Sequence, residues 1–389
     1  MKTFNGKRLK SARQYRGLTV EELSQRINVS KQSISQYENG IIENVPFDKV
    51  LALSIELKFP YNYFIQKDSG LVRSGSTYFR SLMKTSKKYR TAQIVKMEHL
   101  AEIYVFLNEY LDFPQLNLPN WIGNIESPGE AACALRDYWG LSDGPIDNII
   151  RTVEQNGILV TTFATDTDDI DAFSQFVEFG NESIYLIAIS NNKDSAARIN
   201  FDVAHELGHI ILHEWSEDEE AISREEFKNK EKEANEFAAA FLMPEKEFAK
   251  EVSLDSQNLD YYIQLKRKWR VSIVAMLYRA CSLEIITPNQ YQYMMRIMQN
   301  KGWRKSEPLD SIIRTPKPSL LSDAIDVLLV NKVFTPQELV EELGNMGLAM
   351  EPSELEILLN LKPGTLIQKV IPNERIVALK SNISKNGEQ

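Results

Sequence analysis

Apolar residues in the first 66 positions recur three and four residues apart, which is the spacing of short amphipathic helices. Glycines and capping residues divide this pattern. Gly17 and Gly40 end helices, and Thr19-Val-Glu-Glu22 is a capping box that begins one. The pattern therefore predicts five helices with a shared core, near residues 6–16, 19–27, 30–40, 47–57 and 61–65.

Beyond residue 90 the pattern changes from helical to mixed. A helix near Thr91–Leu111 and a stretch punctuated by Pro114 and Pro119 are expected to separate two modules. After residue 127, short apolar runs interrupt the helical spacing. They predict strands at 157–163, 172–179 and 183–189, and helices at 130–138, 146–156 and 196–213. We interpret this part as α+β, with a small antiparallel sheet packed beside the last of these helices.

The C-terminal part is predicted to be mainly helical. A strong helical pattern runs from Lys230 to Met243, and Pro244 helps to stop it. Residues 260–310 are helical as well. Residues 320–389 predict helices at 320–331 and 335–346 and strand-like runs at 364–370 and 375–379, which we interpret as a small α/β accessory region without visible chemistry.

Charge is spread unevenly along the 389 residues. The net charge is −9, yet residues 1–96 hold 18 Lys and Arg against 7 Asp and Glu. This asymmetry indicates that the N-terminal part meets a polyanion. The basic segment 68–96 has two interpretations, a path along a phosphate backbone or a solvated linker. The chain contains no apolar run of 18 residues and no signal-peptide core, so we expect a cytoplasmic protein without a membrane partner.

Three of the four histidines lie within the nine residues 205–213, in the sequence His205-Glu206-Leu-Gly-His209-Ile-Ile-Leu-His213. On a helix, residues four apart share a face, so His205 and His209 can hold one metal ion. Glu206 lies next to the first ligand, where its carboxylate can act as a general base toward a metal-bound water. The alternative, a core helix with satisfied histidines, does not explain why a rare residue clusters on one helix.

Two histidines are too few for catalytic zinc, which takes three protein ligands and leaves a place for water. Candidates for the third ligand lie on the helix that ends near Pro244. Glu231 is flanked at helical spacing by the small residues Ala234, Asn235 and Ala238, so this face can pack against the histidine helix. Glu233 is the fallback, although it points about 160° away from Glu231 around the helix.

Residues 6–66 resemble the Cro/C1-type (XRE) helix-turn-helix, a DNA-binding fold. The matching residues are Leu9-x-x-x-Arg13, Gly17-Leu-Thr-x-x-Glu-Leu23 and Val29-Ser30-x-x-x-Ile34-x-x-x-Glu38-x-Gly40. The resemblance implies that the third helix enters the major groove of an operator. Four residues would then contact DNA: Lys31, Gln32 and Ser35 at base edges, and Asn39 near phosphate. It also implies an internal ion pair between Arg13 and Glu38.

Residues 127–310 resemble the ImmA/IrrE family of metallopeptidases. The matching motifs are Phe201-x-x-Ala204-His-Glu-Leu-Gly-His209-x-x-Leu-His213 and Glu231-x-x-Ala234-Asn235-x-Phe237-Ala238. The resemblance implies Zn²⁺ as cofactor and Glu231 as the third ligand, with Asn235 steadying a ligand. His213 is expected to be structural or to support the site, because the glycine turn of three-histidine zinc peptidases is replaced by Ile211-Leu212. We expect a substrate to lie extended beside an edge strand near Ala172-Phe173-Ser174.

These observations predict a multidomain protein, with an all-α helix-turn-helix domain, an α+β zincin-like peptidase domain and a small accessory region. The expected boundaries are 1–67 for the DNA-binding domain, 68–125 for a basic helical linker, 126–250 for the peptidase core, 251–310 for its helical lobe and 311–389 for the accessory region. The resemblance implies a regulatory zinc endopeptidase that cuts a regulatory protein such as a repressor. It leaves open whether the chain forms a homodimer. The alternative is a transcription regulator or antitoxin-like protein whose peptidase-like domain senses a metal or ligand and cuts nothing.

Overall fold

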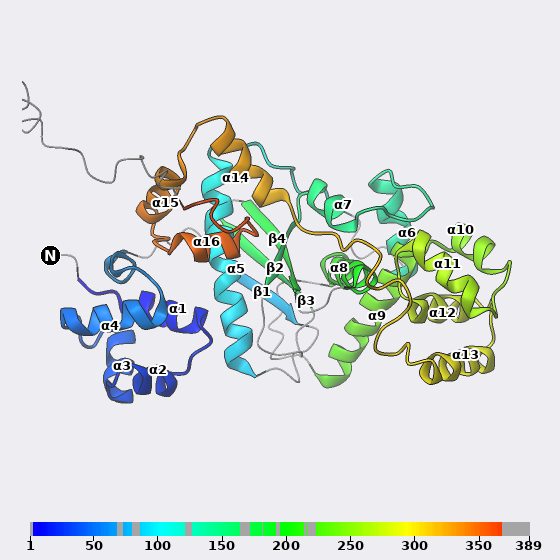
Figure 1. Ribbon diagram of the computed structural model, residues 1–389, viewed down its shortest axis with the longest axis horizontal. Helices are drawn as coiled ribbons and strands as arrows, with labels where there is room; N and C mark the ends of the chain where they lie inside the picture. The colour runs from blue at the N-terminus through cyan, green and yellow to red at the C-terminus, as the bar shows by residue number, and fades with distance from the viewer. Residues whose placement is uncertain are drawn as a thin grey trace, which may run out of the picture.

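The computed structural model describes residues 3–67, 73–79, 86–120, 127–163, 172–180, 182–191, 195–213, 215 and 223–367. The molecule is elongated. The N-terminal helices lie at one end, a sheet with flanking helices occupies the middle, and a helical lobe forms the other end (Figure 1). A helix-turn-helix domain is thus followed by a mixed α/β unit, as the sequence predicts.

The N-terminal domain consists of four α-helices and a short 3₁₀ helix, η1. The helices are α1 (Gly6–Tyr15), α2 (Val20–Arg26), α3 (Lys31–Glu38), α4 (Phe47–Leu57) and η1 (Tyr61–Ile65). The capping box at α2 is present, since Thr19 and Glu22 bond each other's backbone N–H groups. Leu9, Leu23, Ile34 and Leu53 are fully buried between the helices. The apolar spacing of the sequence therefore describes this core correctly.

The central sheet has four strands in the order β1-β3-β4-β2. The strands are β1 (Arg73–Phe79), β2 (Leu159–Phe163), β3 (Ala172–Phe179) and β4 (Glu182–Ser190). β3 pairs antiparallel with both β1 and β4, but β2 pairs parallel with β4, from Leu159 opposite Leu186 to Phe163 opposite Ser190. The prediction of an antiparallel sheet is therefore correct for β3 and β4 and wrong for β2. β2 is buried at four of its five positions, a pattern that is typical of parallel strands covered on both faces.

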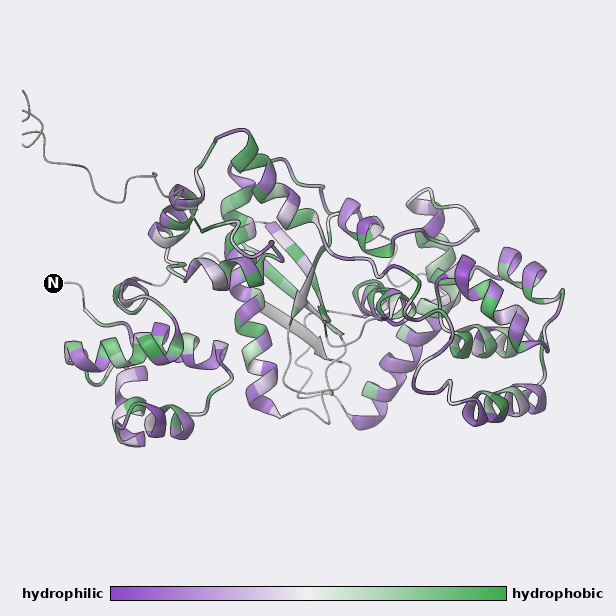
Figure 2. Ribbon diagram, in the orientation of Figure 1, coloured by the Kyte–Doolittle hydropathy of each residue, from purple (hydrophilic) through white to green (hydrophobic). Residues whose placement is uncertain are grey.

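Both faces of the sheet are covered by helices. Along β4, Ile184, Leu186 and Ala188 belong to one hydrophobic core, whereas Ile187 and Ile189 belong to another. The first core contains α5 (Lys87–Asn108), and the second contains α8 (Ala196–Leu212). Figure 2 shows hydrophobic residues gathered in this central part of the molecule. The sheet thus separates the α5 side from the side that carries the histidine cluster.

The segment expected to be a basic helical linker takes part in the folded unit. β1 pairs with β3, and α5 packs against both the sheet and α1 of the N-terminal domain. The pairing of β1 joins residues about a hundred positions apart, such as Arg73 and Glu178, and local sequence patterns carry no signal for such a partner.

The C-terminal helices α14 (Leu320–Val330), α15 (Pro336–Asn345) and α16 (Pro352–Leu358) join the same core as α5. They also contact the N-terminal domain, since Arg16 forms an ion pair of 2.8 Å with Glu354. Gly364–Ile367 forms turns and bends where the sequence predicted a strand. The predicted strand 375–379 lies outside the described residues.

The remaining helices either contact α8 or form the lobe. They are α6 (Pro128–Tyr138), α7 (Ile149–Gln155), α9 (Arg224–Leu242), α10 (Glu245–Val252), α11 (Leu259–Trp269), α12 (Ile273–Ser282) and α13 (Pro288–Asn300). None of the helices in the described part of the chain has the length and apolar character that a bilayer crossing requires.

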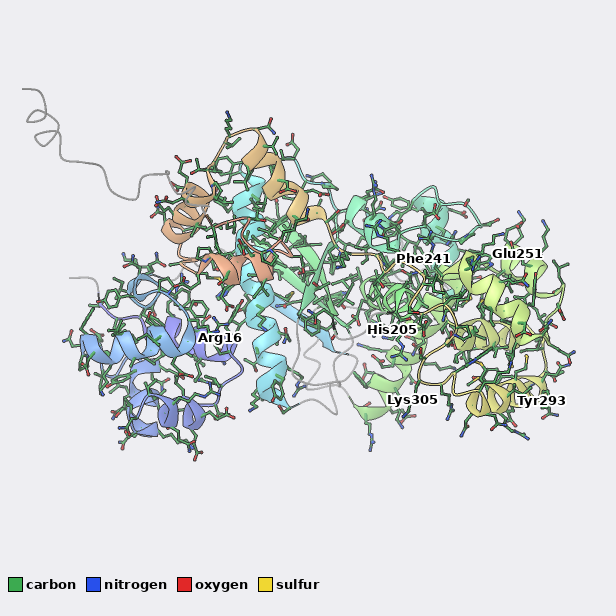
Figure 3. The ribbon with its side chains drawn as sticks, in the orientation of Figure 1. Arg16, His205, Phe241, Glu251, Tyr293 and Lys305 are labelled. Atoms are coloured by element: carbon green, nitrogen blue, oxygen red, sulfur yellow. The ribbon has the colours of Figure 1, made fainter. Side chains whose placement is uncertain are left out.

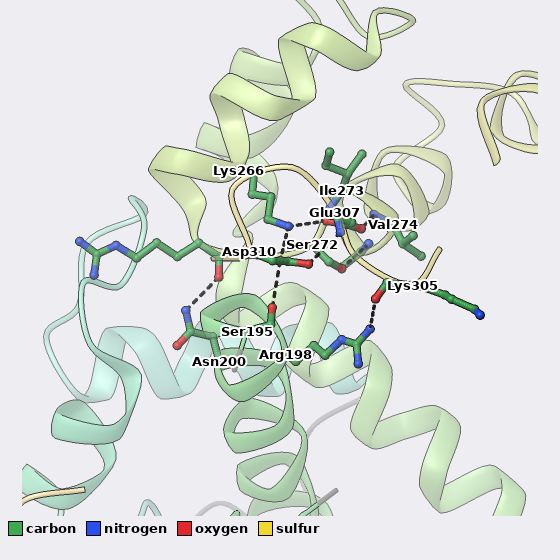
Figure 4. A network of polar contacts seen from close by, with 12 residues as sticks. Ser195, Arg198, Asn200, Lys266, Ser272, Ile273, Val274, Lys305, Glu307 and Asp310 are labelled. Carbon is green, nitrogen blue, oxygen red and sulfur yellow. Dashed lines mark hydrogen bonds and ion pairs between the residues drawn. The ribbon is translucent and has the colours of Figure 1, made fainter. Parts of the chain in front are cut away.

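A buried ionic network fastens the lobe to the start of α8 (Figure 4). The ammonium of Lys266 lies 2.7 Å from carboxylate oxygens of both Glu307 and Asp310. Asp310 accepts a hydrogen bond from Ser195, which precedes α8, and Glu307 accepts from the backbone N–H groups of Ile273 and Val274. A carboxylate at a helix N-terminus is favourable, so Glu307 both caps α12 and holds it in place.

Candidate metal centre

Helices α8 and α9 bring the predicted ligands together. In Figure 3 the labelled His205 lies between the sheet and the helical lobe. His205 is completely buried and His209 almost so, and they lie one turn apart on α8. Figure 2 shows that the N-terminal half of α9, which carries Glu231, is mostly hydrophilic. Glu231 projects from this half of α9 toward both rings.

The three side chains converge on one point. The Nε2 atoms of His205 and His209 are 3.1 Å apart. Glu231 places Oε1 3.2 Å from His209 Nε2 and Oε2 3.6 Å from His205 Nε2. Burial by itself raises the pKa of Glu231, but hydrogen bonds and charge from the two histidines outweigh burial and hold this pKa at about 2. The carboxylate is therefore ionised, as a metal ligand must be.

This donor set fits zinc. Two imidazole nitrogens and one carboxylate are a common ligand set for catalytic zinc, which keeps its fourth position for water or substrate. His205, His209 and Glu231 form the one group of potential ligands in the described residues whose donor atoms all lie within 4.8 Å of one another. Glu233, the fallback ligand, does not belong to this group.

Glu206 lies beside the converging ligands and is held by the sheet. It is completely buried, and its Oε2 accepts a hydrogen bond of 2.6 Å from the hydroxyl of Ser174 on β3. A hydrogen bond to a carboxylate is stronger than one between neutral groups, so Ser174 fixes the orientation of Glu206.

His213 and Asn235 lie next to the candidate ligands. His213 places Nδ1 2.9 Å from Nδ1 of His209, and its Nε2 lies 3.1 Å from Oε2 of Glu233. Burial and the neighbouring His209 lower the pKa of His213 to about 4. The amide of Asn235 donates to the backbone carbonyl of Glu231 at 2.7 Å, so it steadies α9 at the ligand and does not touch the carboxylate.

Gly208 explains how close the two helices come. A Cβ atom at this position would lie 3.1 Å from Phe237 Cδ1 and 3.2 Å from the backbone of Ala234 on α9. The element that approaches closely at Gly208 is therefore α9. A larger residue would push α9, and with it Glu231, away from the histidines.

The edge of β3 that was expected to receive a substrate is covered by β1. Tyr78 pairs with Ser174, and Phe79 pairs with Phe173. The predicted substrate edge near Ala172-Phe173-Ser174 is therefore inside the sheet in this structure, and β1 forms the edge.

The four predicted DNA contacts lie on one exposed face of the N-terminal domain. Lys31, Gln32, Ser35 and Asn39 are all exposed on or at the end of α3. Asn39 donates to Ser35 through its side-chain amide at 2.8 Å, and Lys31 lies 3.5 Å from Glu21. The expected ion pair between Arg13 and Glu38 is present and buried, with Arg13 Nη2 donating to Oε2 at 2.9 Å.

The sequence did not indicate the contacts of two further residues, Ser174 and His99. Ser174 was considered only as part of a strand edge, although a polar residue among buried neighbours in β3 was a signal for an internal contact. His99 of α5 lies buried among Tyr15, Phe59 and Tyr63 of the N-terminal domain. A lone histidine in a helical stretch gave no indication of that contact.

Comparison with protein families agrees with this architecture. Residues 6–70 match a helix-turn-helix domain, and residues 153–280 match a peptidase family described as the IrrE N-terminal-like domain. No curated protein matches the chain. The chain thus joins an XRE-type helix-turn-helix to an ImmA/IrrE-type domain, and the matched segment contains His205, Glu206, His209 and Glu231 but not β1.

Proposed function

We propose that this chain, in which a DNA-binding helix-turn-helix is joined to an IrrE-like metallopeptidase domain, is a transcriptional regulator with zinc endopeptidase activity. Its substrate would be a regulatory protein such as a repressor. The observation that carries the proposal is the convergence of His205, His209 and Glu231 beside a carboxylate, Glu206, that Ser174 holds in place.

Separate residues would bind the metal, transfer the proton and orient the base. His205, His209 and Glu231 would hold Zn²⁺, which, when bound, supplies a Lewis acid for the peptide carbonyl and acidifies water. Glu206 would accept the proton of the attacking water and later donate it to the leaving amine. Ser174 orients Glu206 through its hydrogen bond to Oε2. Burial of the site excludes competing solvent from Glu206.

We also propose a path for the substrate along the sheet. An extended peptide that adds to β3 beside Ser174 would lie where β1 now lies. We propose that such a peptide replaces β1 along this stretch.

The N-terminal domain would select the site of action. Lys31, Gln32 and Ser35 are exposed at the start and along one face of α3, and Gln and Lys are suited to adenine and guanine edges respectively. Helix-turn-helix proteins commonly bind two half-sites as dimers. An exposed apolar stripe on α4, made of Phe47, Leu51 and Ile55, supports a homodimer.

The deciding experiment compares the zinc-loaded chain with Glu206→Gln on DNA-bound repressors from the same genomic neighbourhood. We expect the wild type to cut one of them and Glu206→Gln to bind zinc equally well yet cut none. Cleavage retained by Glu206→Gln would exclude this residue as the base. Operator binding without cleavage of any candidate would favour the alternative function, a regulator whose peptidase-like domain senses a metal or ligand.

DNA binding is tested separately by a salt-dependent mobility-shift assay. Replacing Lys31 and Gln32 by glutamate should abolish specific binding, because base contacts would be lost and phosphate repelled. Unchanged affinity would place the DNA-contacting face elsewhere.

A further inference from the structure

A pocket opens beside the metal centre, between α9 and the lobe helices α12 and α13. Its volume is about 540 Å³. Glu231 and Asn235 of α9 line it, so it begins at a proposed metal ligand. Phe201, one turn before His205 on α8, lines it as well. Of the proposed ligands, Glu231 thus lines the pocket, whereas His205 and His209 are buried behind it and do not.

The walls of the pocket are mainly apolar. They are formed by Phe201, Ala239, Val274, Ala275, Tyr278 and Tyr291. Aromatic walls of this kind suit a flat ring, because ring pairs in offset or edge-to-face contact add to the gain from burial. The volume lies within the range of small-molecule sites, which leaves room for a ring-bearing side chain and part of a neighbouring residue.

The α12 wall is held firmly. Glu307 accepts hydrogen bonds from the N–H groups of Ile273 and Val274 at the start of α12, and Lys266 holds Glu307 (Figure 4). A pocket discriminates between side chains only when its walls are rigid. The buried network provides that rigidity next to Val274.

The rim of the pocket is basic. Lys228 and Lys232 on α9 line it, three residues before and one residue after Glu231. Both are exposed. Lys232 lies 3.6 Å from Glu236 on the same helix, but an exposed pair of this kind is weak, so both ammonium groups can still bind a charged group. An acidic residue next to the ring-bearing residue would complement them.

We infer that this pocket is the specificity subsite of the peptidase and takes the aromatic side chain of a residue at the scissile bond, with a neighbouring carboxylate at the lysine rim. This inference rests on the proposed function. The substrate class is thus a peptide segment that combines a Phe-, Tyr- or Trp-type residue with an adjacent Asp or Glu.

The test measures binding, so that it does not depend on turnover. The zinc-loaded chain is titrated with phenylalanine hydroxamate and with alanine hydroxamate, which share a zinc-binding group and differ in the side chain. We expect the phenylalanine probe to bind at least about tenfold more tightly, because the ring is buried in the pocket. Ala275→Phe, which fills the pocket, should remove this preference, and the variant should still bind the alanine probe through the zinc-binding group.

Ser282→Phe is the matched control, because it adds the same ring to the exposed end of α12 outside the pocket lining. It should keep the preference. The basic rim is tested with the hydroxamates of Asp-Phe and Asn-Phe. The Asp probe should bind several-fold more tightly, and the double substitution Lys228→Gln and Lys232→Gln should abolish that difference.

The outcomes separate the two proposals. If neither hydroxamate binds the zinc-loaded chain, the proposed metal chemistry fails, and the subsite fails with it. If both bind equally tightly, the metal chemistry stands, and the subsite is overturned. A preference for phenylalanine that survives Ala275→Phe would also overturn it.

Discussion

The hydroxyl of Ser174 donates a 2.6 Å hydrogen bond to Oε2 of Glu206, and this contact ties the sheet to the proposed base. Both residues are completely buried. The two residues come from different elements, β3 and α8, so the bond forms only when the sheet and α8 are correctly packed against each other. It links the strand that a substrate would join to the residue that would move the proton.

Replacing Ser174 by alanine should lower kcat about ten- to a hundredfold without loss of zinc. A hydrogen bond to a charged group is worth roughly 1.5–3 kcal/mol, and about 1.4 kcal/mol corresponds to a factor of ten in rate. The measurement is peptide cleavage together with the zinc content of the purified chain. Ser174→Thr, which keeps the hydroxyl, should restore most of the rate. Full activity in Ser174→Ala would show that Glu206 needs no such support.

Weakening the β1–β3 pairing should raise cleavage. In a strand, the N–H groups of alternate residues donate to a given partner strand. Of Thr77 and Tyr78, which lie opposite Gln175 and Ser174, only one therefore donates to β3, and proline at that position removes one hydrogen bond of the ladder. We expect one of the two single variants to increase kcat/KM several-fold, because the edge of β3 becomes available to a peptide.

Hydrogen exchange provides the control for this prediction. The effective proline variant should show faster amide exchange in β3, whereas the other should resemble the wild type. Faster exchange with unchanged or lower cleavage would mean that the substrate does not use the β3 edge.

The parts of the site that depend on local spacing were predictable from sequence. A helix places residues four apart on one face, so His205 and His209 follow directly from the H-E-x-x-H spacing. The face of α9 that carries Glu231 was predictable from its small neighbours, and the structure places Glu231 against His205 and His209, whereas Glu233 contacts His213.

The parts that depend on distant pairing were not predictable. β1 has no alternating apolar pattern, and its partner lies about a hundred residues away, so the segment resembled a basic linker. The direction of β2 was also undetermined, because alternation sets the faces of a strand but not the orientation of its neighbour. His99 is a similar case, since only the packing of α5 on α1 and η1 gives it a role.

A charge on the apolar stripe of α4 should prevent dimer formation. Ile55 is 71% exposed and lies one and two turns from Leu51 and Phe47. Ile55→Asp should yield a monomer in a light-scattering mass measurement and lose affinity for a palindromic operator. Ile312→Asp, at an equally exposed position outside the stripe, should leave the mass unchanged. A monomeric wild type would remove the basis for the stripe as an interface.

Low pH should reduce the folding stability of the N-terminal domain because His99 is buried in its neutral form. Burial, and next the charge of Arg8, lowers the pKa of this imidazole to about 3 in the folded chain. Because this value lies below the unfolded value of about 6.5, the stabilisation is present above pH 6.5 and is lost as pH falls from 6.5 toward 3. At pH 5 the loss amounts to about 2 kcal/mol.

The His99 prediction is checked by urea unfolding at several pH values between 5 and 7.5. His99→Gln keeps a neutral polar side chain against Tyr63 and should have a flatter dependence on pH than the wild type. The difference between the two curves isolates His99 from the other acid-sensitive groups. Parallel curves would mean that His99 does not resist protonation in the fold.

Loss of the buried ammonium at Lys266 should destabilise the lobe strongly. Its side chain is completely buried and holds the carboxylates of Glu307 and Asp310, so Lys266→Met leaves two buried charges without their cation. Removal of one partner of such a network costs about 3–5 kcal/mol. Lys268→Met is the control, because Lys268 is half exposed in its pair with Glu251, and exposed pairs contribute at most about 1 kcal/mol. Thermal unfolding of the two variants should therefore differ by several degrees or more. A similar loss in both variants would mean that the network does not anchor α12 and the start of α8.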